Sequence, residues 1–283
     1  MTTRASATRA IHVCRCRQFR VILPLTASQK AAVYPQGGSP MCQDCKQSTL
    51  SLSRRRLLRG SVGLSAAAMA GMLGWPEVAA ATSAAPAIAP EAVMKELTAG
   101  NARHVAGVQT CTNFLANRAA LAKGQHPMAI VLGCSDSRVP PEYVFDQAPG
   151  GLFVVRVAGN FVDTDGLASM EYAVGHLGVP VIVVLGHSSC GALTAAVEVE
   201  QKHVSLPGHL PSLAEHLATP VRTALAGNPP DPVAAAIRAN VLYTMERLKT
   251  EPSEVAEAIH AGKVTVAGGV YDLASGAVTF VKA

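Results

Sequence analysis

Two apolar runs of this sequence end in side chains that can bind a metal ion. The first run closes in LGCSDSR, where Cys134 follows the glycine. The second closes in LGHSSCGAL, where His187 follows the glycine and Cys190 comes three residues later. Two thiolates and one imidazole are ligands of the softness that Zn²⁺ prefers. Three protein ligands leave a fourth position open, which is typical of a catalytic zinc site rather than a structural one.

Two further polar side chains, Asp136 and Arg138, follow the first run at alternate positions. Zn²⁺ lowers the pKa of a bound water to about 7, and the resulting hydroxide needs an acceptor that orients it. Asp136, two residues from a ligand, is placed for that task, and it could also swing onto the metal as a fourth ligand. Arg138 can hold the carboxylate in a bidentate pair and keep it off the metal. Without the neighbouring ligands, the two residues would form an ordinary structural ion pair.

These side chains converge only if the two apolar runs lie close together. MAIVLG, GLFVVRVAG and PVIVVLG are continuous apolar runs, as expected for strands buried on both faces of a parallel sheet. In open α/β sheets, sites form beyond the carboxyl ends of the strands, so Cys134 can reach His187 and Cys190. The last two are one helical turn apart, and Cys190 opens a predicted helix whose dipole favours a thiolate.

The cysteines also have interpretations that need no metal. Either of these thiols alone would be an ordinary buried side chain, and a disulfide between Cys134 and Cys190 is the main structural alternative. The spacings C-x-C and C-x-x-C near the N-terminus look like half metal sites, but no matching Cys or His pair lies nearby. The other cysteines are therefore interpreted as incidental or as lone thiols: Cys14, Cys16, Cys42, Cys45 and Cys111.

Helical and strand patterns alternate from Pro90 onward. Beside the three apolar runs, we expect strands over 263–272 and 277–282, joined by the turn LASG. This alternation predicts an α/β fold with a mostly parallel sheet flanked by helices, closed by a hairpin at one edge. The expected helices cover residues 90–105, 113–125 with Asn113 as N-cap, 165–178 and 190–200, with two or three more within 210–261.

The segment 53–85 is predicted to be an export signal. SRRRLLRG is followed by an apolar stretch of about 15 residues and then by small residues suited to cleavage. The apolar stretch is shorter than the roughly 20 residues of a membrane span, and the arginines resemble a twin-arginine signal. A basic patch before an Ala-rich helix is the alternative. Residues 1–52 are then a disordered or mis-annotated N-terminal extension, in which residues 1–40 precede an expected true start at Met41, and 86–283 form the catalytic domain.

An export signal of this kind predicts a periplasmic or extracellular protein without a stable membrane span after cleavage. Twin-arginine transporters pass folded proteins, so a thiolate site could be loaded with metal in the reducing cytosol. The formal net charge of +5 belongs to this leader, because residues 84–283 hold 13 basic and 17 acidic side chains. The body has no basic run, so we expect no nucleic-acid partner.

The pair of motifs, CSDSR and HSSCG, resembles that of the β-class carbonic anhydrases. The resemblance covers about residues 91–283 and includes LTAGNARHV, FVVRVAGN, SMEYAVGHLGV and VAGGVYDLASGAV. It implies a zinc enzyme, with one Zn²⁺ per subunit, that interconverts CO₂ and bicarbonate by a zinc-bound hydroxide. It also implies four parallel strands with an antiparallel edge strand. The pKa near 7 quoted above was established for a three-histidine carbonic anhydrase of another class and is borrowed for this site.

The resemblance assigns a role to each residue of the two motifs. Cys134, His187 and Cys190 match the zinc ligands, and Asp136 with Arg138 matches the catalytic dyad. The resemblance also implies a homodimer or a higher even oligomer, in which an N-terminal helical arm wraps the neighbouring subunit. Gln125 in GQHP matches a glutamine that contacts substrate across the dimer interface, although from the sequence alone it is an ordinary loop amide.

Within this family, one branch keeps water on the metal and another lets the aspartate close the site. The second branch has a tryptophan three residues before the first cysteine, where this chain has Val131. That difference favours the open branch, although Arg156 and Tyr172, which resemble other residues of the closing device, are present. We expect a small CO₂ pocket lined by Val131, Phe153 and Tyr172. The alternative functions are hydrolysis of carbonyl sulfide or carbon disulfide on the same fold, and non-catalytic zinc binding.

Overall fold

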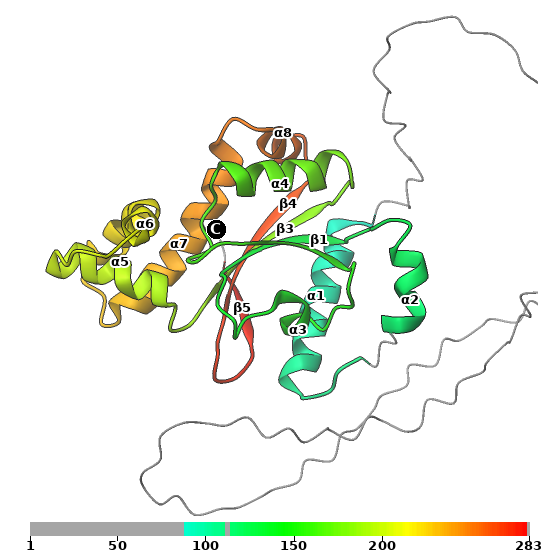
Figure 1. Cartoon of the computed structure of the whole chain (residues 1–283), viewed down its shortest axis with the longest axis horizontal. Coiled ribbons are helices and arrows are strands. Elements are labelled where there is room, and N and C mark those ends of the chain that lie inside the picture. The colour runs from blue at the N-terminus through cyan, green and yellow to red at the C-terminus, as the bar shows by residue number, and fades with distance from the viewer. Residues whose placement is uncertain (1–87, 111–113, 282–283) are drawn as a thin grey trace, which may run out of the picture. The chain divides into compact units, whose positions relative to one another are not determined.

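The computed structural model describes residues 88–110 and 114–281. For residues 114–116 it describes only the backbone. In this part of the chain, helices and strands alternate around one five-stranded sheet (Figure 1). The strands are β1 (Ala129–Gly133), β2 (Leu152–Arg156), β3 (Val181–His187), β4 (Thr265–Tyr271) and β5 (Val278–Val281). The helices are α1 (Pro90–Val105), α2 (Phe114–Leu121), α3 (Pro141–Val144), α4 (Thr164–Gly175), α5 (Gly191–Lys202), α6 (Leu210–Leu225), α7 (Pro232–Thr250) and α8 (Glu254–His260).

The sheet has the strand order β2-β1-β3-β4-β5. The first four strands are parallel, and β5 pairs antiparallel with β4 at the edge. The predicted mostly parallel sheet with one antiparallel edge strand is thus confirmed. Every residue of β1 and β3 is buried, as the continuous apolar runs predicted for central parallel strands.

The side chains of β1 and β3 alternate between the two faces of the sheet. Ile130 and Ile182 pack in a cluster with apolar residues of α4, α7 and α8. Val131 and Val183 point the other way, into a cluster with residues of α1 and α3. Figure 1 shows the same layers, with α4, α7 and α8 on one side of the sheet and α1 and α3 on the other. A third cluster, formed by α5, α6 and α7, reaches Cys134 and Cys190 and so supports the carboxyl end of the sheet.

The observed elements follow the sequence pattern closely in the core and less closely in the loops. The predicted helix 90–105 is α1, and the segment 210–261 forms three helices. The helix predicted over 113–125 is shorter, ending at Leu121, and its expected N-cap Asn113 lies outside the described residues. The single turn α3 was not predicted, because four residues carry no periodicity. The predicted segments 1–52 and 53–85 lie outside the described part of the chain.

Side-chain caps set the starts of three helices. Asp163, Asp231 and Ser253 accept hydrogen bonds from backbone amides in the first turns of α4, α7 and α8. Such caps satisfy donors that have no partner within the helix. Among the described helices, none combines the length and apolar character that crossing a bilayer requires.

One buried amide joins α1 to the opposite end of the chain. Asn101 donates hydrogen bonds to the carbonyl oxygens of Val144 (3.0 Å) and Gly276 (2.9 Å), and its Oδ1 accepts from the amide of Val278 (2.8 Å). The helix approaches very closely here, because a Cβ built on the preceding Gly100 would lie 1.9 Å from the carbonyl oxygen of Phe145. The contact between α1 and the residues after α3 therefore requires glycine.

Replacing Gly100 by alanine should force α1 away from Phe145. Overpacking of this kind costs about 1–3 kcal/mol, and we expect Tm to fall by about 5 °C in a thermal unfolding experiment. The matched control is Gly227→Ala, where the nearest atom to a built Cβ is a carbonyl oxygen at 3.7 Å. The control should change the free energy of unfolding by no more than about 0.5 kcal/mol. Equal stability of Gly100→Ala and the wild type would contradict the packing described.

Candidate metal centre

The structure brings Cys134, His187 and Cys190 together at the carboxyl end of the sheet. Cys134 follows β1, and His187 is the last residue of the neighbouring strand β3. Their potential ligand atoms all lie within 4.8 Å of one another, and all three residues are buried. The register that pairs Gly133 with Leu185 places the ends of the two strands side by side, so residues far apart in sequence become neighbours.

The proximity of His187 and Cys190 has a different origin from the one predicted. They do not share a helical turn, because His187 is still in the strand and Cys190 is the N-cap of α5. The chain reverses between them through Ser189, whose φ of 54° is in the left-handed region. The predicted position of Cys190 at the start of a helix is correct. A tight strand-to-helix turn, and not helix periodicity, presents the imidazole and the thiol to the same point.

The donor set fits a tetrahedral metal ion. Both thiols are free, and their sulfurs are 4.0 Å apart, far beyond the S–S bond of about 2.05 Å in a disulfide. Two sulfurs at about 2.3 Å from a tetrahedral Zn²⁺ would be about 3.8 Å apart. The alternative of a Cys134–Cys190 disulfide is therefore not what the structure contains.

The imidazole of His187 is oriented with one nitrogen toward the sulfurs. Its Nδ1 lies 2.9 Å from the carbonyl oxygen of Ser188, a bond that places the proton on Nδ1. The other nitrogen, Nε2, then presents a lone pair, and within the described residues it is completely buried without a hydrogen-bond partner. A buried polar atom without a partner is costly, so this nitrogen fits a metal ligand.

The two thiols do not share their protons equally. The pKa of Cys134 is lowered, chiefly by the hydrogen bond between the two thiols, and the Gly159 amide also favours the thiolate. The pKa of Cys190 is raised, because its proton is held between the two sulfurs and because it is buried. A lowered pKa of the Cys134 thiol favours the thiolate form, which is the form that binds a metal ion.

Asp136 and Arg138 form a bidentate pair beside these ligands. Arg138 donates from its backbone amide and Nε to Oδ1 of Asp136, both at 2.9 Å, and from Nη2 to Oδ2 at 2.8 Å. The guanidinium holds the pKa of the Asp136 carboxyl well below its usual range. Oδ2 is also 3.9 Å from Nε2 of His187, so the carboxylate faces the ligand cluster. The cluster of ligands and the ion pair therefore form one site.

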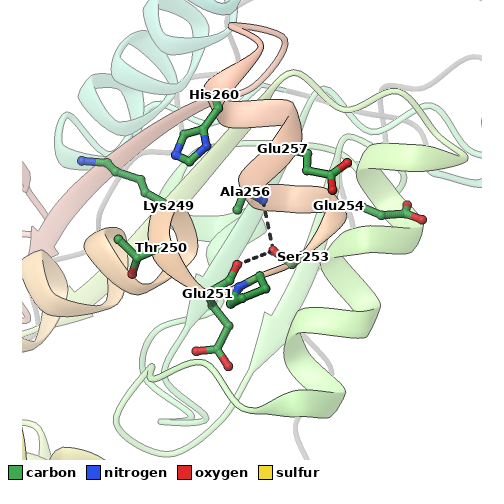
Figure 2. Close-up of a pocket in the computed structure, with 9 residues that line it drawn as sticks. Lys249, Thr250, Glu251, Ser253, Glu254, Ala256, Glu257 and His260 are labelled. Carbon is green, nitrogen blue, oxygen red and sulfur yellow. Dashed lines mark hydrogen bonds between the residues drawn. The ribbon is translucent and has the colours of Figure 1, made fainter.

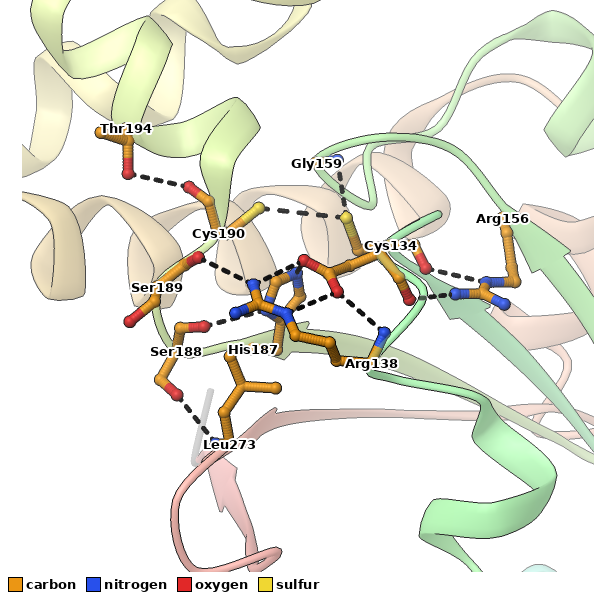
Figure 3. Close-up of polar contacts among 11 residues, drawn as sticks. Cys134, Arg138, Arg156, Gly159, His187, Ser188, Ser189, Cys190, Thr194 and Leu273 are labelled. Atoms are coloured by element: carbon orange, nitrogen blue, oxygen red, sulfur yellow. Dashed lines mark hydrogen bonds and ion pairs between the residues drawn. The ribbon is translucent and has the colours of Figure 1, made fainter. Parts of the chain in front are cut away.

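Two further residues support the loop that carries the site. The resemblance linked Arg156 only to the closing device, and Gly159 was not predicted. Arg156 donates to the carbonyl oxygens of Cys134 (2.8 Å) and Asp136 (2.6 Å), and the amide of Gly159 donates to the sulfur of Cys134 at 3.3 Å (Figure 3). Both belong to FVVRVAGN, but a backbone amide has no sequence signature, and an arginine near the end of a strand has many possible partners. Only the fold reveals these contacts.

Gln125 lies apart from the cluster in this chain. It is exposed in the loop before β1, whereas Cys134 follows that strand, so about 16 Å of strand separates the two positions. A contact between Gln125 and the site would have to come from a second copy of the chain. The predicted role of Gln125 stays a prediction.

The predicted CO₂ pocket lined by Val131, Phe153 and Tyr172 is wrong for this chain. Val131 is buried on the face of the sheet covered by α1 and α3, whereas Phe153 packs on the face covered by α4. The ring of Phe153 lies 6.4 Å from that of Tyr172, on that second face. Pleating explains the error, because Val131 pairs with Val154 and its side chain therefore points away from Phe153.

A separate pocket lies at the junction of α7 and α8, and its lining includes none of the three candidate ligands (Figure 2). Helix α7 runs back from the carboxyl ends of the strands, so its last residues lie at the opposite end of the sheet from the thiols. Within the pocket, Ser253 accepts from the amide of Ala256 and donates to the carbonyl oxygen of Glu251, which is a helix cap. Its lining is mostly charged or polar: Lys249, Thr250, Glu251, Pro252, Ser253, Glu254, Ala256, Glu257 and His260.

Comparison with known proteins identifies the family. The model of the family described as carbonic anhydrase matches residues 129–278. Carbonic anhydrase 2 of Mycobacterium tuberculosis is 40% identical over 192 residues, which are 66% of this chain and 90% of that protein. The chain belongs to the carbonic anhydrase family.

Two solved structures of β-carbonic anhydrases resemble the chain. A tetrameric β-carbonic anhydrase from Sordaria macrospora is 32% identical, with a TM-score of 0.52 over 58% of this chain and 85% of that one. The Coccomyxa β-carbonic anhydrase in complex with acetazolamide is 27% identical, with a TM-score of 0.51 over 68% of this chain and 82% of that one. The fold is therefore that of the β-class carbonic anhydrases.

Titration of the metal-free protein with Co²⁺, a spectroscopic stand-in for Zn²⁺, should give one equivalent of binding with sulfur-to-metal charge-transfer absorption. Cys134→Ser should weaken that absorption and lower the affinity, because one of the two thiolates is lost. Asp136→Asn is the matched control, since it alters a neighbouring side chain that is not one of the three ligands. An unchanged spectrum in Cys134→Ser would contradict the assignment of this cluster as the metal centre.

Proposed function

We propose that this protein is a zinc enzyme that catalyses the reversible hydration of CO₂ to bicarbonate and a proton. The observation that carries the proposal is the convergence of two thiols and one imidazole beside an ion-paired carboxylate. Membership of the carbonic anhydrase family supports the same reaction. A purely structural metal site would have no need of Asp136 and Arg138 facing the ligands.

Cys134, His187 and Cys190 would hold the metal ion. When bound, Zn²⁺ supplies a Lewis acid that makes water acidic enough to serve as a nucleophile near neutral pH. Asp136 is ionised at that pH, because Arg138 lowers the pKa of its carboxyl. Its Oδ2 takes one hydrogen bond from Arg138 and therefore retains a lone pair that can accept a second hydrogen bond from the ligand side. Asp136 thus orients the attacking oxygen.

The bidentate pair also supports the open form of the site at rest. Both oxygens of Asp136 are engaged by Arg138, so the carboxylate would have to break these bonds before it became a fourth ligand. Nη2 of Arg138 also donates to the carbonyl oxygen of Ser189 at 3.4 Å. This bond anchors the guanidinium on the turn between His187 and Cys190. Arg138 is thus tied to the ligand loops on both sides.

We further propose that the active unit contains at least two copies of the chain. Gln125 is too far from Cys134 within one chain, so its predicted contact with substrate requires a partner. The tetrameric assembly described for the Sordaria macrospora enzyme supports an even oligomer.

The domain limits and the export route are part of the proposal. Residues 86–283 would form the catalytic domain, which agrees with the described helices and strands between Pro90 and Val281. Residues 53–85 would direct export by the twin-arginine route, and residues 1–52 would be an extension that contains the functional start at Met41. The protein would then act in the periplasm or outside the cell.

Removal of the metal by a chelator should abolish CO₂ hydration, and Zn²⁺ should restore it. Asp136→Asn should lower kcat/KM by about 10²-fold or more, because the neutral amide cannot accept the hydrogen bond as the carboxylate does. Arg138→Ala should lower it on the order of 10²-fold by releasing Asp136 from its position. Stopped-flow measurement of proton release from dissolved CO₂ provides the rates.

The same preparations should be assayed for sulfide release from carbonyl sulfide and carbon disulfide. We expect hydration of CO₂ to be by far the faster reaction. Faster sulfide release would favour the hydrolase alternative, and zinc binding without either reaction would favour a non-catalytic protein. Full hydration activity in a metal-free preparation would refute the zinc mechanism.

The export proposal predicts that replacing Arg54 and Arg55 together by lysine keeps the protein in the cytosol. Twin-arginine signals depend on the arginine pair, whereas a general basic patch would tolerate lysine. Cell fractionation measures the distribution, and replacement of the preceding Ser53 by alanine is the control. Export of the double-lysine variant at the wild-type level would contradict the twin-arginine assignment.

A further inference from the structure

Asn240 is a buried amide on the inner side of α7. The residue is only 1% exposed, and its neighbours along the helix, Ala236, Ile237 and Val241, are buried apolar residues. An amide in such surroundings is costly unless it is hydrogen-bonded. Its Nδ2 donates to the carbonyl oxygen of Gly159 at 2.8 Å, which joins α7 to the turn that follows β2.

The residue that receives this bond also contacts a metal ligand. The amide of Gly159 donates to the sulfur of Cys134 at 3.3 Å (Figure 3). Gly159 has a φ of 90°, and a Cβ built there would lie 2.9 Å from a methyl group of Leu217, so no other residue fits. The carbonyl of Gly159 is thus held by Asn240, and its amide points at the thiol.

The other bonds of this turn leave Gly159 itself unfixed. Val157 donates to the carbonyl oxygen of Gly133 and accepts from the amides of Ser135 and Asn160. These bonds tie the start of the turn to the end of β1. Asn240 fixes the carbonyl of Gly159, which determines the direction of the chain at the point where the amide meets the sulfur.

We propose that Asn240 is a positioning residue for the metal centre, which holds the Gly159 amide against the Cys134 thiolate. A backbone amide that donates to a thiolate stabilises its charge and fixes its direction. Partners outside the ligand shell typically change metal affinity by 10- to 100-fold. The inference rests on the proposed zinc site and assigns a role to a residue on a helix that supplies no ligand.

A positioning role and a merely structural role make different predictions for stability. Oδ1 of Asn240 is buried and has no hydrogen-bond partner among the described residues, so the amide is only partly satisfied. Replacing it by an apolar side chain of similar size removes that unsatisfied oxygen along with the bond to Gly159. The substitution also leaves the buried carbonyl of Gly159 without its partner, so the metal-free protein should lose some stability, whereas the affinity for the metal should fall.

The test compares Asn240→Leu with the wild type in the full chain. Zn²⁺ affinity is measured by competition with a chromophoric chelator, and the thermal midpoint is measured on the metal-free protein. We expect Zn²⁺ to bind about tenfold more weakly to Asn240→Leu, with only a small decrease of the metal-free midpoint. Thr244→Val is the matched control, because it removes a buried hydroxyl one turn along α7. The control should keep the wild-type affinity.

Equal Zn²⁺ affinity in Asn240→Leu and the wild type would overturn the inference while leaving the proposed function intact. Equal losses in Asn240→Leu and Thr244→Val would also overturn it, because the packing of α7 would then be the cause. A wild-type protein that binds no Zn²⁺ would instead overturn the proposed function. If Asn240→Leu does not fold, Asn240→Ser, which stays polar but cannot reach Gly159, carries the same expected loss of affinity.

Discussion

The parallel pairing of β1 with β3 is the constraint on which the site depends. Because the two strands run in the same direction in a fixed register, their carboxyl ends lie side by side, and the chain leaves both at the same edge. Cys134 follows one strand and His187 ends the other, so the sheet itself brings a thiol and an imidazole together. The turn through Ser189 then adds the second thiol at the start of α5. A slip by one residue would turn these side chains to opposite faces.

Hydrogen bonds from neighbouring backbone and side-chain groups hold the ligands in place. The Ser188 carbonyl fixes the imidazole, the Gly159 amide fixes one sulfur, and Arg156 holds the carbonyl groups of the loop between Cys134 and Asp136. Arg138 joins that loop to the turn at Ser189. The surrounding groups thus orient the three candidate ligands, and the carboxylate of Asp136 is oriented by the same set of contacts.

The sequence was sufficient for the fold class and for the convergence of the three ligands, because buried parallel strands have continuous apolar runs and their ends share an edge. It was not sufficient for side-chain direction. Val131 and Phe153 were expected in one pocket, yet pleating sends them to opposite faces. His187 and Cys190 were expected on one helical turn, yet a left-handed residue brings them together. The role of Gly159 could not be predicted, since its contact with Cys134 is made by the backbone amide, which almost every residue type has.

X-ray absorption at the zinc edge of the purified protein tests the central claim most directly, because it reports the atoms around the metal without depending on activity. The account predicts one zinc ion per chain with two sulfur ligands, one imidazole nitrogen and one further light atom. Four sulfur ligands, or a zinc ion with only nitrogen and oxygen around it, would contradict the account.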